Sequence, residues 1–141
     1  MKNLLAAPAP FLALLFAAAP LQAQDNANLR SDLTGIYTPA QADRGHQLYA
    51  FRCARCHDTG FSGAPRLGDG RFINDFLGHS VFELANLIHT SMPDDQPGTT
   101  PRPEAADLTA YILSVMHVPP GDAELPADDS FLQTIRIDVP R

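Results

Sequence analysis

The segment Cys53-Ala54-Arg55-Cys56-His57 constrains this chain more than any other part of its sequence. Two cysteines separated by two residues and followed directly by a histidine form the attachment signature of a c-type haem, in which each thiol adds to a vinyl group and the histidine ligates the iron. Because His57 is covalently next to Cys56, it must approach the iron from the face that the thioethers hold. We therefore expect one covalent haem at Cys53 and Cys56, with His57 as the proximal iron ligand.

Two other interpretations of the same cysteines are a redox dithiol and half of a zinc site. A structural zinc site of this type usually needs a second Cys or His pair at short spacing. The chain has two cysteines in all, and its other histidines are scattered at His46, His79, His89 and His117. A thioredoxin-like dithiol needs a βαβ context, which the sequence does not show. The motif therefore favours haem attachment.

The first 23 residues have the pattern of an export signal. Lys2 supplies a positive charge, residues 4–19 are almost wholly apolar, and Leu21-Gln22-Ala23 precedes polar residues. Three prolines interrupt this segment, which is already near the minimum length for a transmembrane span. We expect cleavage after Ala23, so the sequence predicts a periplasmic protein that is tied to the membrane only if the signal stays uncleaved.

The chain that remains after cleavage would be acidic and long enough for one domain. Removal of the signal removes the only lysine and leaves nine arginines against sixteen acidic residues, a formal balance of 9 − 16 = −7. This balance speaks against nucleic acid as a partner, because binding to phosphates requires positive charge. For a soluble carrier, this acidity bears on the sign of the surface charge of the protein that it docks against.

Capping residues and apolar spacing predict three principal helices and a short one. The first runs from the N-cap Thr38 to about Arg52, with Gln41 completing a capping box. The second has a Ser80 and Glu83 capping box and ends near Thr90, and the third begins near residue 103 and ends before residue 119. A short helix is expected at 72–77, and the glycine-rich segment 58–70 reads as a loop around the cofactor.

A six-coordinate haem needs a second axial ligand, and methionine sulfur is the ligand that raises the reduction potential. Met92 precedes Pro93, which pushes it out of helical conformation and onto a loop. Met116 lies beside the apolar stripe of the third helix, where methionine usually fills the core. Residue types and spacing therefore favour Met92, and His89 is the competing ligand.

These motifs, in this order, resemble the small class I c-type cytochromes of bacteria. The resemblance covers about 39–118. Gly45 and Tyr49 look like the glycine and aromatic residue of the family's N-terminal helix, and Ala110-Tyr111-Ile112-Leu113 is similar to the C-terminal helix that crosses it. It implies an all-α fold of three to five helices around one covalently bound haem c.

The resemblance also assigns roles in the haem pocket. In Gly63-Ala64-Pro65-Arg66-Leu67, the Pro65 carbonyl would accept a hydrogen bond from His57, and Leu67 would pack on the haem. Met92-Pro93 resembles the methionine-ligand loop of the family. Arg66 and Arg71 are candidates for pairing with haem propionates, because a guanidinium offers two donors; ordinary solvated arginines are the alternative.

The predicted organisation is a signal peptide at 1–23, a flexible leader at 24–37, a cytochrome c domain at 38–118, and a tail at 119–141 that packs on the domain. The expected function is periplasmic electron transfer, without enzymatic activity, from a dehydrogenase to an oxidase or another cytochrome. Within the family, the chain looks most like cytochromes found beside quinoprotein-type periplasmic dehydrogenases. Alternatives are a tightly bound cytochrome subunit of a dehydrogenase complex and a haem sensor or peroxidase-like enzyme with a labile methionine ligand.

Overall fold

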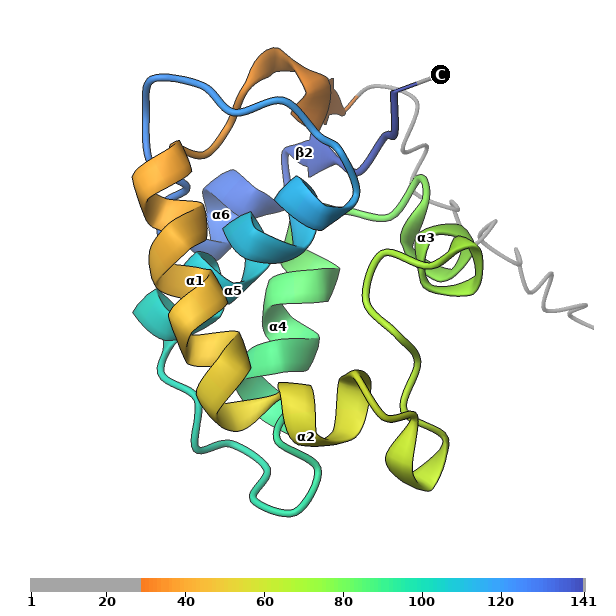
Figure 1. Ribbon diagram of the computed structural model, residues 1–141. Coiled ribbons are helices and arrows are strands. Elements are labelled where there is room, and N and C mark those ends of the chain that lie inside the picture. The colour runs from red at the N-terminus through yellow and green to blue at the C-terminus, as the bar shows by residue number, and fades with distance from the viewer. Residues whose placement is uncertain (1–28, 141) are drawn as a thin grey trace, which may run out of the picture.

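The computed structural model describes residues 29–140, so the predicted export signal and the start of the predicted leader lie outside the described residues. The regular secondary structure of this part is helical apart from one short pair of strands, which confirms the predicted all-α class (Figure 1). In chain order its elements, with η marking a 3₁₀ helix, are β1 (Arg30–Ser31), η2 (Asp32–Thr34), α1 (Pro39–Arg52), α2 (Ala54–His57), η3 (Phe61–Gly63), α3 (Gly70–Phe76), α4 (Val81–Ser91), α5 (Arg102–Val115), α6 (Asp129–Leu132) and β2 (Ile135–Arg136).

The main helices begin where local capping predicts. Thr38 accepts a hydrogen bond from the Gln41 N–H at the start of α1, and Ser80 and Glu83 form a complete capping box at the start of α4. The predicted capping role of the Gln41 side chain is wrong. That side chain is buried and exchanges two hydrogen bonds with the backbone of Leu125, at 2.9 and 2.7 Å. It therefore fastens the C-terminal segment to α1.

Helices α1 and α5 cross in close contact (Figure 1), and Gly45 of α1 lies against Asp107 and Tyr111 of α5. A Cβ atom built on Gly45 would overlap the Asp107 carbonyl oxygen and lie 2.8 Å from Tyr111 Cβ. The ring of Tyr111 lies 5.1 Å from the ring of Tyr49, centroid to centroid. Glycine at position 45 thus lets the two backbones approach, and the aromatic pair packs beside the crossing.

Residues 29–37, the described part of the predicted leader, pack against the C-terminal part of the chain. Ile36 and Tyr37 are buried, and the Tyr37 hydroxyl donates to the Val118 carbonyl. Strand β1 pairs in parallel with β2, with Arg30 opposite Ile135. The apolar residues at 36 and 37 have too few neighbours in sequence to reveal a periodic pattern, but burial against the C-terminal segment orders them.

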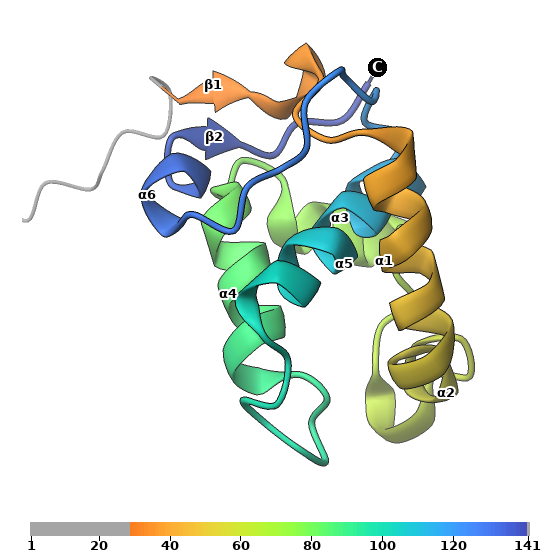
Figure 2. The ribbon, with the colours of Figure 1, turned by 90° about the vertical axis from the view of Figure 1, so that its left-hand side faces the viewer.

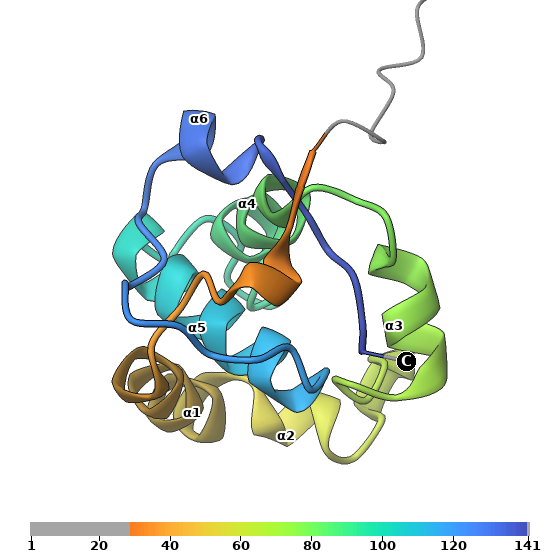
Figure 3. The same cartoon turned by 90° about the horizontal axis from the view of Figure 1, so that it is seen from above.

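The C-terminal segment beyond residue 118 packs on the domain through four buried side chains, Leu125, Leu132, Ile135 and Ile137. Together with β1 it covers the end of the domain opposite α2 (Figure 2). Figure 3 looks down on this covered end. The far end, which carries α2 and the connection between α4 and α5, is where a cofactor can be held.

Asp32 is fully buried where these two terminal segments meet. Its Oδ1 accepts a hydrogen bond of 2.9 Å from the Asp138 N–H, and its Oδ2 has no hydrogen-bond partner within residues 29–140. Burial raises the pKa of Asp32 to about 7, although the bond from Asp138 acts in the opposite direction. This carboxyl group lies at the covered end of the domain, away from α2.

Candidate haem site

The attachment motif occupies a sharp junction between two helices. Helix α1 ends as the Cys53 N–H donates to the Tyr49 carbonyl, and α2 closes as the His57 N–H donates to the Cys53 carbonyl at 3.0 Å. Because α2 is a single turn, Cys53 and Cys56 are held close to His57 on one short rigid segment. Both cysteines are half-buried and form no disulfide.

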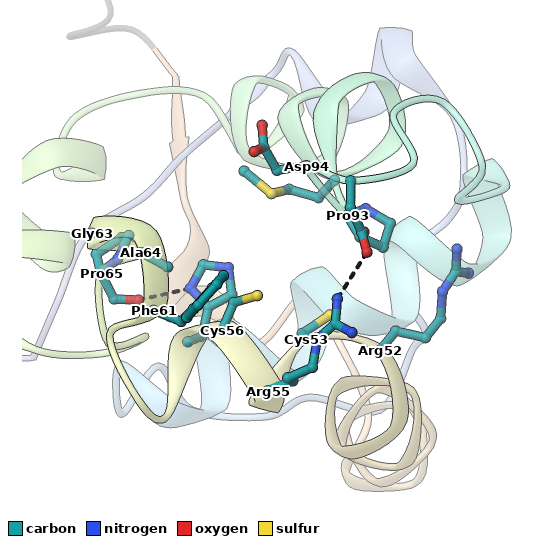
Figure 4. A pocket seen from close by; sticks show the side chains of 13 residues that line it. Arg52, Cys53, Arg55, Cys56, Phe61, Gly63, Ala64, Pro65, Pro93 and Asp94 are labelled. Carbon is teal, nitrogen blue, oxygen red and sulfur yellow. Dashed lines mark hydrogen bonds and ion pairs between the residues drawn. The ribbon is translucent and has the colours of Figure 1, made fainter.

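These three residues line a cavity of about 330 Å³ together with Met92, which is within the size range of about 300–1,000 Å³ typical of ligand pockets. One wall comes from the attachment junction, a second from the loop that contains Pro65, and the third from the segment that follows α4. Figure 4 shows Cys53 and Cys56 between the Pro65 loop and the Pro93 side of the cavity. The complete lining is Arg52, Cys53, Arg55, Cys56, His57, Phe61, Gly63, Ala64, Pro65, Met92, Pro93, Asp94 and Asp95.

The His57 ring is oriented by the backbone. Its Nδ1 lies 2.7 Å from the Pro65 carbonyl oxygen, drawn as the dashed line that ends at Pro65 in Figure 4. A carbonyl oxygen only accepts hydrogen bonds, so Nδ1 carries the proton and Nε2 is free to bind a metal. This is the contact that the resemblance implies, and it fixes both the tautomer and the ring plane.

Met92 also lines the cavity, at the C-cap of α4 and in extended conformation. The two competing ligands are placed elsewhere. Met116 is 1% exposed in the hydrophobic core, and His89 directs its Nδ1 to the Thr100 carbonyl oxygen at 2.7 Å. Among the described residues that were candidates for a second ligand, Met92 alone lines the cavity with His57.

The structure distributes the other predicted pocket residues differently. Pro65 lines the cavity, whereas Leu67 packs against the hydrophobic core and is not part of the lining. Arg66 and Arg71 are exposed and do not line the cavity. The arginines that do so are Arg52 and Arg55. Sequence reasoning missed them, although their positions beside the two cysteines were the available signal.

Arg52 and Arg55 both reach the segment that follows Met92. Arg52 bonds to Glu104 at 2.7 Å and also donates to the Thr99 carbonyl and hydroxyl oxygens. Arg55 pairs with Asp95 at 2.8 Å. The attachment junction and the methionine-bearing segment are therefore tied together across the cavity.

The chemistry of the cysteines argues against the two alternative readings of the motif. Burial raises the pKa of the Cys53 thiol, whereas a reactive redox dithiol needs a lowered pKa. Within residues 29–140, no cluster of three or more His, Cys, Asp or Glu side chains could hold a metal ion. The two thiols, the free His57 Nε2 and a cavity beside them do fit a covalently attached haem.

An all-α domain with this attachment site defines a monohaem c-type cytochrome, a protein that transfers electrons through its haem. The comparison with protein families agrees, because the family model described as cytochrome c oxidase, cbb3-type, subunit III, matches residues 40–112. The match covers slightly more than half of the chain, which belongs to this family and carries a covalently bound haem c. Comparisons with curated proteins and with solved structures gave no match. No helix in the described part of the chain is long and apolar enough to cross a membrane.

Proposed function

We propose that this protein carries one electron at a time on a haem whose iron is ligated by His57 and Met92. The observation that supports this proposal is the cavity that Cys53, Cys56, His57 and Met92 line together. When bound, the haem supplies one-electron redox chemistry at its iron, and methionine sulfur opposite histidine favours the reduced state.

The protein's own residues keep the site closed to other chemistry. Cys53 and Cys56 would hold the macrocycle, the Pro65 carbonyl orients His57, and Met92 in the cavity lining would supply the second ligand to the iron. Ligation of the iron by two side chains would leave it no position for a substrate, which supports a carrier rather than an enzyme. Phe61, which is 65% exposed at the cavity, offers an apolar rim for brief contact with a redox partner.

The proposed compartment is the periplasm, and the proposed partners are a dehydrogenase donor and an oxidase or cytochrome acceptor. The export-signal pattern of residues 1–23 supports this location. The family description names an oxidase subunit, which favours an oxidase on the acceptor side. It also supports a second candidate function, a tightly bound cytochrome subunit of a larger complex. Purification from periplasm in constant ratio with a catalytic chain distinguishes this second candidate from a free carrier.

Methionine ligation is tested by making the same replacement at both methionines of the described chain. We expect Met92→Leu to abolish the weak sulfur-to-iron charge-transfer absorption of the oxidised protein while leaving one haem attached. Met116→Leu conserves volume in the core and is expected to leave this absorption unchanged. Persistence of the band in Met92→Leu would contradict the proposed ligation. Loss of the band in Met116→Leu would instead assign the ligating sulfur to Met116.

A further inference from the structure

Thr100 holds the backbone of Met92 from inside the domain. Its side-chain hydroxyl donates a hydrogen bond of 2.8 Å to the Met92 carbonyl oxygen. Thr100 is 2% exposed, so water does not readily replace this bond. The bond spans eight residues of chain and closes the connection between α4 and α5 at the point where Met92 leaves the helix.

His89 holds Thr100 directly, and Arg52 holds its neighbour Thr99. The His89 ring donates from Nδ1 to the Thr100 carbonyl oxygen at 2.7 Å, which anchors Thr100 to the end of α4. Arg52 donates to the carbonyl and hydroxyl oxygens of the preceding Thr99, at 3.3 and 3.1 Å. Since Arg52 immediately precedes Cys53, these bonds form a continuous chain from the attachment junction to the backbone of Met92.

The other tie between the attachment junction and this connection is weaker. Arg55 and Asp95 form an ion pair whose side chains are 76% and 54% exposed. Exposed pairs contribute little, because water and salt screen them. The buried bond from Thr100 is therefore better placed than the largely exposed ion pair to keep Met92 beside the cavity.

We propose that Thr100 is a positioning residue for Met92, and that Arg52 and His89 keep Thr100 in place for this purpose. This inference rests on the proposed ligation of the iron by Met92. It gives His89, which the sequence offers as a rival ligand, a structural role instead. It also couples the attachment helix to the methionine-bearing segment, so that loosening the network increases the fraction of molecules in which the sulfur has left the iron.

The test compares Thr100→Val with Thr100→Ser in the haem-loaded protein. Valine keeps the shape of threonine but leaves the buried Met92 carbonyl without its donor, whereas serine retains the hydroxyl. We expect Thr100→Val to weaken the sulfur-to-iron absorption and to bind carbon monoxide in the ferrous form about tenfold faster, as the open population rises. Thr100→Ser is expected to recover most of the wild-type behaviour.

Thr109→Val is the matched control. Thr109 is also a buried threonine, but its hydroxyl donates to the Ala105 carbonyl within α5. A general loss of stability would therefore affect Thr109→Val as well, whereas a positioning effect is confined to Thr100→Val. Equal spectra and equal carbon monoxide rates in Thr100→Val and wild type would overturn the inference.

Two further outcomes are informative. If Thr100→Val does not accumulate, Arg52→Gln tests the same chain of bonds from its other end: a weaker band per attached haem supports the inference, and an unchanged band overturns it. Failure of the proposed ligation is recognised separately, because the band would then persist in Met92→Leu. A band that depends on Met92 but not on Thr100 or Arg52 would remove the positioning role and leave the ligand assignment intact.

Discussion

Serine replacement of both cysteines, Cys53→Ser with Cys56→Ser, is expected to reduce the covalently bound haem from one per chain to none. A serine hydroxyl lacks the nucleophilic thiolate through which cysteine reacts, so neither attachment bond can form. The measurement is the pyridine haemochrome spectrum of denatured protein, from which haem that is not covalently bound has been extracted.

Met116→Leu, in the core and away from the cavity, is the control and should retain one haem per chain. Covalent haem in the double serine variant would mean that another residue carries the attachment. The same result would mean that Cys53 and Cys56 do not attach the haem, contrary to what their spacing and their place in the cavity indicate.

Gly45→Ala is expected to destabilise the fold by about 2–3 kcal/mol, by overpacking at the crossing of α1 and α5. In the interior of an ordinary helix the same replacement stabilises by roughly 0.5–1 kcal/mol, so the predicted sign is reversed. The reason is local: a Cβ at position 45 meets the Asp107 backbone, which cannot move without separating the helices. Equilibrium unfolding in denaturant gives the free-energy difference.

Gly70→Ala provides a matched control for this effect. Gly70 is the first residue of α3, and no atom lies within 4 Å of the position that a Cβ would occupy. This variant should be neutral or slightly more stable than wild type. If Gly45→Ala behaved in the same way, the two helices would not be in the close contact described.

Local patterns predicted the helices and the attachment site because each depends on residues near one another in sequence. Ser80 and Glu83 are three residues apart and form the predicted capping box. Cys53, Cys56 and His57 lie within five residues, so one helical turn brings them together whatever the rest of the fold. The position of Met92 followed from the conformational effect of the next proline.

Contacts between distant segments were not predictable in the same way. The bond from Tyr37 to Val118 joins residues 81 positions apart, and that from Gln41 to Leu125 joins residues 84 apart. No periodicity in either segment indicates such a pairing. The sequence alone therefore predicts a flexible leader at 24–37 and a capping box that includes Gln41.

The arginines show the same limit. An arginine near the attachment motif in sequence is a candidate to line the haem pocket. Which arginine does so depends on the path of the backbone. That path exposes Arg66 and Arg71 and turns Arg52 and Arg55 towards the segment that follows Met92. The hydrogen bonds of Thr100 with Met92 and His89 also depend on this path, so the sequence alone does not predict them.

Carbon monoxide binding to the unmodified ferrous protein at neutral pH tests the proposed electron carrier most directly. The proposed ligation by His57 and Met92 would leave no free position on the iron, so carbon monoxide should bind slowly or not at all, limited by the departure of Met92. The Met92→Leu protein should bind it rapidly under the same conditions. Rapid binding by the unmodified protein would contradict the carrier and favour a haem sensor or peroxidase-like enzyme with a labile methionine.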